Sequence, residues 1–427
     1  MKVMLDPARA RTSAERSSSR RRRRRWAAAV VIVAVLVWVP RVPGHHQASV
    51  LGDLAASDLV AAVTRAVPVV RDRPAQPCAR LESEFETNTN LLRNYEIGWY
   101  ASIWSDYHAL NALYFTSLRP GGQACRTDVE DNVAAIDASY WDTSYGKAPA
   151  AFDQGPAAIH FHPDPPRVDD SLWMALAVDQ DYLTTGHRAD LARAAAVFRM
   201  AIANWDPRHG GIYWKSHTDG GTDHEKAVVS NAPAVVLGSA LYAETGQSSY
   251  LTWSARILDW VEHNLRDRGT GLYDDHIGDD TGPATIDADK LTYNQGIVVG
   301  AMAALATVDP ARHPLVDAVD LARRSMAYFR VHHTYGIPPY DAIWAQNLLW
   351  TAGLYRNAAF TGAARSSLDL ARRADPVGSS DLLDEGAEMA LEALSRLPAT
   401  GYPELSPVRA PGPAVRGSTE PSAPGSP

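Results

Sequence analysis

Apolar residues recur at helical spacing along most of the chain. Leu172, Ala175, Leu176 and Leu183, for example, fall on one stripe of a helix, whereas β-branched runs that alternate every second residue are scarce. The pattern therefore predicts an all-α fold. Helices are expected at residues 97–118, 126–139, 169–185, 188–204, 226–245, 248–265, 293–307, 314–330, 340–359 and 381–396.

Glycines mark a repeat in this helical pattern. Three apolar helices are expected to stop at Gly186, Gly246 and Gly362, as is typical of left-handed helix caps. A second series, about half a period away, consists of Gly211, Gly271 and Gly336. A period of roughly 60 residues predicts stacked helical hairpins, with tight turns at one end and long loops at the other. Five to six hairpins would fit in the folded part, so a closed toroid with the long loops at one mouth is feasible.

The composition is that of a globular protein with an acidic body. The chain has 427 residues, of which 46% are hydrophobic and 21% charged, so a mostly disordered protein is excluded. Residues 1–41 carry 11 Lys and Arg against 2 Asp and Glu, which leaves the rest of the chain at −17 when the whole chain is at −8. Because an acidic body repels phosphate backbones, we expect no nucleic-acid partner.

The basic N-terminus has the pattern of an export signal. Six arginines at 20–25 precede an uncharged apolar stretch at 26–39, which ends at Pro40. Fourteen residues are short for a spanning helix, which needs about 20. A cleaved signal peptide, an uncleaved anchor with the N-terminus inside, and a basic tail before a buried helix all remain open. Either export route places the body outside the cytoplasm, secreted or tethered to the membrane.

The chain is expected to divide into four segments. Residues 1–41 form the basic N-terminus with its signal or anchor, and residues 42–78 form a linker or stalk. Residues 79–396 form the folded domain, and the tail at 397–427, with 8 prolines in 31 residues, is expected to be disordered.

The two cysteines exclude a disulfide scaffold and any multi-thiolate metal site. After export, Cys78 and Cys125 could form one disulfide, and two buried thiols are the alternative.

Pairs of neighbouring aspartates are the main candidates for chemistry. Asp169 and Asp170 stand at the start of a predicted helix, where carboxylates also cap free amides. Two close carboxylates push their titrations apart, which supplies the acid and the base that glycosidic bond cleavage needs. Two further pairs lie in the acidic segment 274–289, which is expected to be a solvated loop, with a calcium site as a weaker alternative because no EF-hand spacing is met.

An ordered set of motifs resembles glycoside hydrolase family 76. The set consists of Arg-Val-Asp-Asp-Ser-Leu-Trp at 167–173, Tyr-Leu-Thr-Thr-Gly at 182–186, Trp-Asp at 205–206, Gly-Gly-Ile-Tyr-Trp at 210–214 and Thr-Tyr-Asn-Gln-Gly at 292–296. The resemblance implies an (α/α)6 barrel that cleaves α-1,6-mannosidic bonds inside a mannan chain. It also implies that Asp169 is the nucleophile and Asp170 the general acid/base of a retaining mechanism. Retention requires the two carboxyl groups to lie about 5–5.5 Å apart.

Six residues are expected to bind the sugar chain. Trp173 and Trp214 could present flat apolar faces to pyranose rings, although Trp173 could equally be a core residue. Tyr293, Asn294 and Gln295 begin a helix and could cap it, but the resemblance implies that their segment faces the barrel centre. Asn231 belongs to the same expected subsite. Lys226-Ala227 departs there from the Lys-Asn that the family often carries, which puts one polar contact in question.

The sequence thus predicts an exported, endo-acting, retaining α-1,6-mannanase with a mannan-type polysaccharide as its partner. The 14 histidines show no metal-binding spacing, so neither a metal nor another cofactor is expected. Two alternatives remain: a transglycosylase that uses the same two aspartates, and a non-catalytic glycan-binding protein on the same helical frame.

Overall fold

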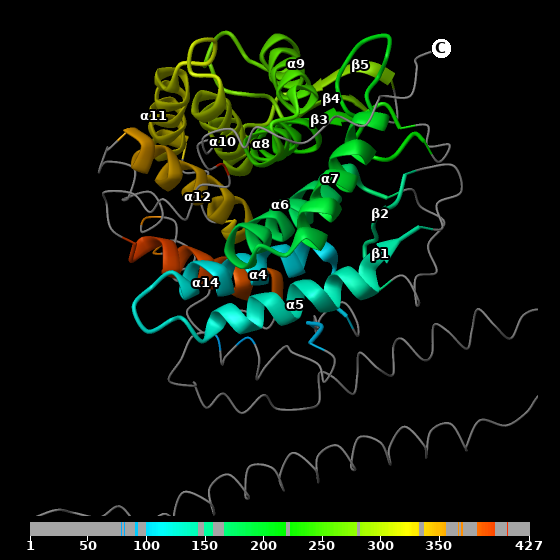
Figure 1. Ribbon diagram of the computed structural model, residues 1–427. Coiled ribbons are helices and arrows are strands. Elements are labelled where there is room, and N and C mark those ends of the chain that lie inside the picture. Colours follow the sequence, from blue (N-terminus) through cyan, green and yellow to red (C-terminus); the bar gives the residue numbers. More distant parts are fainter. Residues whose placement is uncertain are drawn as a thin grey trace, which may run out of the picture. The chain divides into compact units, whose positions relative to one another are not determined.

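The computed structural model describes residues 78, 81, 90–92, 100–143, 149–156, 166–218, 223–279, 282–332, 337–355, 366, 369, 382–397 and 408 (Figure 1). All of them belong to the second of two compact units, Val69–Pro427. The predicted N-terminal segment and nearly all of the predicted stalk and tail lie outside these residues, as do Gly336 and Gly362. Among the described helices, none has the length and apolar character that crossing a bilayer requires.

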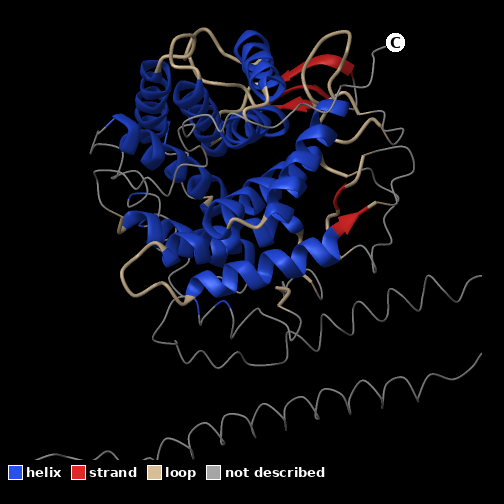
Figure 2. Ribbon diagram, viewed as in Figure 1, coloured by secondary structure: helices blue, strands red, loops and turns tan. Residues whose placement is uncertain are grey.

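The prediction of an all-α fold is confirmed, and each expected helix has a counterpart (Figure 2). The helices among the described residues are α4 Ile103–Ser117, α5 Cys125–Tyr140, α6 Val168–Thr185, α7 Arg188–Ala203, α8 Val228–Thr245, α9 Ser248–Asn264, α10 Thr292–Val308, α11 Leu315–His332, α12 Pro338–Tyr355 and α14 Leu382–Ser395. Helix α4 begins later than expected because the Ser102 side chain accepts a hydrogen bond from the Ser105 amide and caps the helix there.

Alternate helices form a closed inner ring. Helices α4, α6, α8, α10, α12 and α14 pack side by side in this order, and α14 returns to pack against α4. Helices α5, α7, α9 and α11 lie outside the ring, against their inner partners (Figure 1). The fold is therefore an (α/α)6 toroid, as the resemblance implied.

The composition of each helix explains its place in the toroid. All of α4 except Trp104 is buried, as expected for a helix with neighbours on every side. The outer helix α7 buries a single stripe, which consists of Ala194, Val197, Phe198, Met200 and Ala201. The inner ring also needs small residues at its closest contacts. A Cβ on Gly296 of α10 would lie 2.4 Å from the Trp344 Cα of α12.

The two ends of the ring differ as the glycine repeat predicted. Gly186 and Gly246 end α6 and α8 in the left-handed conformation, with φ of 78° and 72°, and start tight turns. At the opposite end, the inner helices α6, α8 and α10 begin after long loops. Helix N-termini carry partial positive charge, so this end, the mouth, favours negative groups.

The expectation of a solvated loop at 274–289 is wrong. Strands β4 His276–Asp279 and β5 Gly282–Asp287 form an antiparallel hairpin, and β4 also pairs with β3 Lys226–Ala227 from a distant part of the chain. A second small sheet pairs β1 Trp141–Asp142 with β2 Ala151–Phe152. These strands are too short and too rich in acidic residues to show an alternating pattern, and β3 displaces the predicted start of α8 by two residues.

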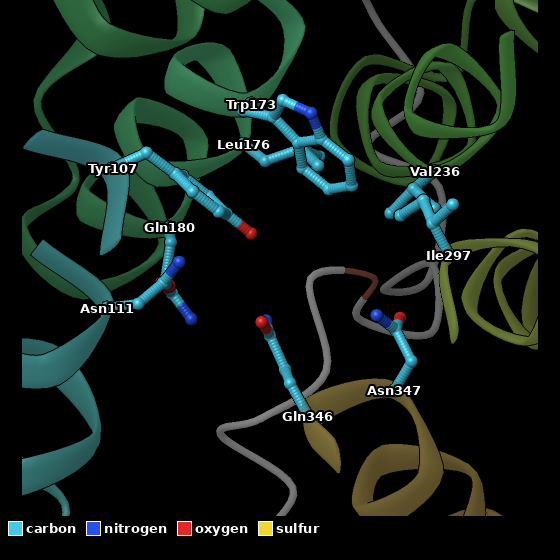
Figure 3. A pocket seen from close by; sticks show the side chains of 9 residues that line it. All are labelled: Tyr107, Asn111, Trp173, Leu176, Gln180, Val236, Ile297, Gln346 and Asn347. Carbon is cyan, nitrogen blue, oxygen red and sulfur yellow. The ribbon is translucent and has the colours of Figure 1, made fainter. Parts of the chain in front are cut away.

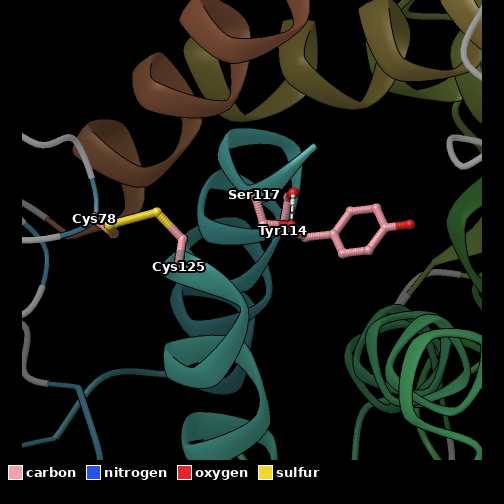
Figure 4. The surroundings of a disulfide bond; sticks show 4 residues. All are labelled: Cys78, Tyr114, Ser117 and Cys125. Carbon is pink, nitrogen blue, oxygen red and sulfur yellow. Dashed lines mark hydrogen bonds between the residues drawn. A yellow bond between two sulfur atoms is a disulfide. The ribbon is translucent and has the colours of Figure 1, made fainter. Parts of the chain in front are cut away.

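The two cysteines form a disulfide, which resolves the alternative of buried thiols (Figure 4). Cys125 begins α5, and the Cα atoms of Cys78 and Cys125 are 5.5 Å apart. The bond ties the start of the folded region to the outer side of the first hairpin.

Candidate active site

The neighbouring aspartates lie at the mouth of the ring, in the first turn of α6. This end of α6 is fixed by the loop that carries Trp214, because the Val168 amide donates to the Trp214 carbonyl at 2.8 Å. Asp170 is buried, and its Oδ2 accepts a hydrogen bond from Gln154 Nε2 at 2.6 Å. Asp169 is half-buried and accepts hydrogen bonds from the Trp214 indole and from the Asp170 amide. Side chains outside α6 therefore bind both carboxyl groups, which capping of the helix alone would not require.

Burial makes these two carboxyl groups hard to ionise together. The pKa of Asp169 lies well above its ordinary value because of burial and the neighbouring charge of Asp170, while Trp214 and Arg167 oppose the shift. Burial also raises the pKa of Asp170, and Gln154 and Arg167 oppose that shift. Such a pair holds one proton between two acids over a wide pH range. It can therefore offer an acid and a base at the same pH.

Two aromatic side chains border the pair at the mouth. Trp214 is half-buried, and the cations of Arg167 and Lys215 lie 5.1 Å and 5.2 Å from its ring centroid. Tyr293, at the start of α10, stacks on Tyr340 of α12 with the rings 4.1 Å apart and nearly parallel. These are the two predicted sugar-binding aromatic residues that the structure leaves partly exposed.

A second group of ionisable side chains surrounds Tyr293. Burial raises the pKa of Tyr293, and the charges of Asp275, Asp169 and Glu225 raise it further, which places these acids around one phenol. Burial also raises the pKa of Glu225 to about 7, with His276 opposing the shift. Glu225 and Asp275 thus add carboxyl groups at the mouth beside the pair Asp169 and Asp170.

Asn294 orients one of these additional acids. Its Nδ2 donates to Asp275 Oδ1 at 2.6 Å, and the Asn294 side chain is fully buried. On the other side, His276 Nδ1 lies 2.9 Å from Asp275 Oδ2. Asn294 therefore contacts an acid at the mouth through Nδ2, while its Oδ1 has no hydrogen-bond partner among the described residues.

Asn231 and Gln295 hold loops instead of facing a ligand. The Asn231 amide bonds both the amide and the carbonyl of Ile212, and the Gln295 amide does the same to Tyr273. Both side chains are fully buried. Because the loop backbone uses both ends of each amide, the structure does not support their prediction as substrate ligands. The same pair of hydrogen bonds to a loop backbone occurs in two repeats, which explains why Asn231 and Gln295 both carry an amide.

Trp173 belongs to the core and not to a sugar platform. Its indole is 1% exposed and packs against Tyr107 and Trp104, with ring centroids 5.4 Å and 5.8 Å away. It borders a narrow cavity inside the ring, which Figure 3 shows from close by. That cavity offers about 20 Å³ to the centre of a water molecule, roughly enough for one water and far too little for a sugar.

The sequence interpretation missed Gln154, Glu225, His276 and Tyr340. Gln154 and Glu225 stand in loops without periodicity, so their sequence neighbours give no signal. Asp275 was considered only as part of a solvated acidic pair. Its position just after Gly271, in the repeat that also contains Gly211, was the signal that could have placed it at the mouth.

One group at the mouth also has the atoms to hold a cation. Oxygen atoms of Asp275 and Asp287 and a ring nitrogen of His276 lie within 4.8 Å of one another.

Part of the sequence is similar to known glycoside hydrolases. The sequence profile of glycosyl hydrolase family 76 matches residues 163–342. Two curated relatives are the mannan endo-1,6-alpha-mannosidases DCW1 of Candida glabrata, 33% identical over 115 residues, and DFG5 of Saccharomyces cerevisiae, 30% identical over 148 residues. These matches cover 26% and 32% of this chain, and only 26% and 31% of the relatives' own length.

Solved structures show the same fold. A family 76 glycoside hydrolase from a bovine Bacteroides thetaiotaomicron strain superposes with a TM-score of 0.63 at 18% identity, over 74% of this chain and 76% of that chain. The GH76A alpha-1,6-mannanase from Salegentibacter sp. HEL1_6 gives a TM-score of 0.60 at 18% identity, over 75% and 96% of the two chains. A variant of that mannanase with two adjacent aspartates replaced by alanine is described as inactive and was solved with alpha-1,6-mannotetrose.

The toroid is the fold of solved family 76 glycoside hydrolases, and in this chain the paired carboxylates lie at its mouth. Over residues 163–342 the chain is similar to glycosyl hydrolase family 76.

Proposed function

We propose that this protein is an exported, endo-acting and retaining α-1,6-mannanase that cleaves a mannan-type polysaccharide. The observation that carries the proposal is the buried pair Asp169 and Asp170 at the mouth of the ring, each bound by a side chain from outside its helix. The curated relatives are mannan endo-1,6-alpha-mannosidases, which supports α-1,6-mannan as the substrate. Export rests on the basic and apolar N-terminal pattern.

In the proposed mechanism, Asp169 attacks the anomeric carbon while Asp170 protonates the leaving oxygen. A covalent glycosyl-enzyme forms, and water then releases it with Asp170 acting as the base. The Trp214 indole and the Arg167 guanidinium favour the ionised form of Asp169, which attack requires. Loss of the Asp170 proton to the leaving group then makes Asp170 the base that the second step needs.

The surroundings of the pair suit a sugar chain. Trp214 and Tyr293 offer flat rings beside the carboxyl groups, and pyranoses present C–H faces to such rings. Glu225 and Asp275 add carboxyl groups that can accept hydrogen bonds from hydroxyls. An inactive variant of the Salegentibacter mannanase, changed at two adjacent aspartates, supports the assignment of chemistry to such a pair.

The first experiment incubates the purified full chain with linear α-1,6-mannan and follows product size and anomeric configuration by NMR. We expect medium-sized oligosaccharides early in the reaction, with α-configured new reducing ends. Asp169→Asn and Asp170→Asn should each abolish cleavage. The matched control is Asp274→Asn in the other Asp-Asp pair at the mouth, where Asp274 is bound to Lys290. Unchanged polymer, or near-normal activity in both Asn variants of the pair, would reject the proposal.

A second experiment separates the roles of the two aspartates. Asp170→Asn should still react with an α-1,6-mannobiosyl fluoride, because fluoride leaves without a proton, and azide should restore turnover with an α-configured mannosyl azide. Asp169→Asn should give no such product. The opposite pattern would exchange the two roles, and transfer to an added mannan acceptor in place of water would identify a transglycosylase.

A further inference from the structure

The turn between α6 and α7 lies at the end of the ring opposite the mouth (Figure 1). Three side chains that carry metal-binding atoms come together at this turn. Asp181 lies in the last turns of α6, while His187 and Asp190 stand at the start of α7. One ligand atom from each lies within 4.8 Å of the other two. His187 Nδ1 and Asp190 Oδ2 are 3.8 Å apart. Two ligands of a tetrahedral zinc ion, each at about 2.0–2.1 Å from the metal, are separated by roughly 3.3 Å.

Asp181 is buried with part of its carboxyl group unused. Its side chain is 4% exposed, and its Oδ1 has no hydrogen-bond partner among the described residues. Asp190 Oδ2 is likewise buried, and the carboxyl groups of Asp181 and Asp190 hydrogen-bond each other. Buried carboxyl oxygens normally pair with a donor or a metal, because leaving them without a partner costs free energy.

The outer helix α5 adds more negative charge at this turn. Glu130 acts electrostatically on Asp181, and Asp137 acts on Asp190. Arg193 binds Asp137 and so neutralises one of these acids. The charges of Asp190 and Glu130 raise the pKa of Asp181, and His187 opposes this shift. A divalent cation would balance this excess.

The next hairpin shows that the turn does not need these three residues in order to fold. The α8–α9 turn repeats the α6–α7 turn closely, with a left-handed glycine at each helix end. The His187 amide donates to Thr185 Oγ1 at 3.2 Å, and the Gln247 amide donates to Thr245 Oγ1 at 3.3 Å.

The residues that correspond to the metal-binding trio have no such chemistry in the second turn. Sixty positions after Asp181, His187 and Asp190 stand Leu241, Gln247 and Tyr250. The same backbone therefore forms without a carboxylate or imidazole at these three positions, so local folding does not explain why three potential ligands meet in the first turn.

We propose that Asp181, His187 and Asp190 bind a divalent metal ion of the zinc class, which ties α6 to α7. One imidazole nitrogen with two carboxylates is a donor set that suits Zn²⁺, whereas Ca²⁺ prefers oxygen ligands throughout. His187 is 65% exposed at its side chain and can rotate to complete the site, and water can fill a fourth position.

The ion is expected to stabilise the protein without taking part in sugar chemistry. Asp170 and Asp181 are eleven residues apart on α6, so the two sites are separated by roughly 16 Å along the helix. This inference is independent of the proposed mannanase activity.

The test uses the full chain, freed of metal by a chelator and with any affinity tag removed. Titration calorimetry with Zn²⁺ alone should show binding, and a hundredfold excess of Zn²⁺ over its Kd should raise the Tm by about 5 °C or more. Ca²⁺ at the same concentration should give a smaller shift. Asp181→Asn and His187→Gln should each weaken this binding at least tenfold. His187→Gln places in the first turn the residue found in the second.

Two controls keep the test decisive. His276→Gln removes the imidazole of the trio at the mouth and should leave intact the zinc binding that Asp181→Asn removes. Because His187 is exposed, His187→Gln should keep a native near-UV circular dichroism spectrum and the Tm of the metal-free wild type, so that lost binding cannot reflect unfolding. Absence of zinc binding by the metal-free wild type, or unchanged affinity in both Asp181→Asn and His187→Gln, would overturn the proposal.

Discussion

At the scale of single residues, the ring interior changes the charge of the ionisable groups that it encloses. Asp106 and His108 both lie on α4 and are almost fully buried. Burial raises the pKa of Asp106 to about 8 and lowers the pKa of His108 to about 3. At neutral pH both side chains are therefore neutral, which keeps charge out of the inner ring and leaves the excess of carboxylates to the two ends.

Asp106 should make the stability of the protein depend on pH. Its pKa rises from 3.8 to about 8 on folding, so the unfolded chain releases this proton first and stability falls as pH rises between these values. Asp106→Asn removes that dependence. Between pH 5 and 8, the free energy of unfolding of the wild type should fall by about 1.4 kcal/mol per pH unit relative to that of the variant. Denaturant unfolding at several pH values measures this difference. A constant difference across this range would contradict the prediction.

Gln154 should tune the titration of the aspartate pair. Its hydrogen bond to Asp170 favours the ionised carboxylate and lowers the pKa of that group. Gln154→Leu removes this donor, so the pKa of Asp170 should rise further. If Asp170 is the acid, the alkaline limb of the kcat/KM profile on mannan should move to higher pH. The remote variant Gln247→Leu serves as the control, and an unmoved alkaline limb in Gln154→Leu would count against the assignment.

At the scale of elements, inner helices differ from outer helices in how closely they approach one another. Helices α10 and α12 meet at Gly296, where the Trp344 backbone fills the space of a side chain. Helices α14 and α4 meet in the same way at Gly386, where a Cβ would lie 2.9 Å from the Ala109 nitrogen. Such contacts can relax only by moving a whole helix, because the obstructing atoms belong to the backbone.

Gly296→Ala should therefore destabilise the ring. The added methyl would meet the Trp344 Cα at 2.4 Å and force α10 away from α12, at a cost of about 3 kcal/mol. Gly155→Ala is the matched control, because nothing lies within 4 Å of the Cβ that it adds. Thermal and denaturant unfolding of both variants would measure the difference, and equal stability would show that the ring packs more loosely than described.

At the scale of the whole folded unit, closure depends on contacts between distant parts of the chain. Helix α14 packs on α4, and the Cys78–Cys125 disulfide holds the segment before α4 to the start of α5. Both links restrain the hairpin of α4 and α5, which otherwise contacts the rest of the ring through α6.

The disulfide should stabilise the unit measurably. Its two cysteines are 47 residues apart, and a loop of that size gives a stabilisation of about 4 kcal/mol in the loop-entropy description. The double variant Cys78→Ser/Cys125→Ser should have a free energy of unfolding that is lower by this amount. It should therefore unfold at a lower denaturant concentration than the wild type. A reducing agent should produce a similar loss in the wild type and none in the double variant. An identical midpoint in the wild type and the double variant would contradict the prediction.

The sequence determined the elements of this protein because helix periodicity and glycine stops are local signals. The ends of α6 and α8 at Gly186 and Gly246 were predicted to the residue, since a left-handed cap depends only on the residues around it. The aspartate pair at the start of α6 and the family resemblance were also local in origin.

Tertiary structure alone decided which polar residues face the mouth. Trp173 follows the aspartates by one turn, yet α4 covers it with Tyr107, whereas Trp214 stays partly exposed. The amides of Asn231 and Gln295 look like sugar ligands in sequence but are used by loop backbones that lie about 20 residues before them. Strand β4, which was expected to be a solvated loop, needed a partner from residues about 50 positions earlier. Burial and pairing depend on neighbours from elsewhere in the chain, and no local pattern records them.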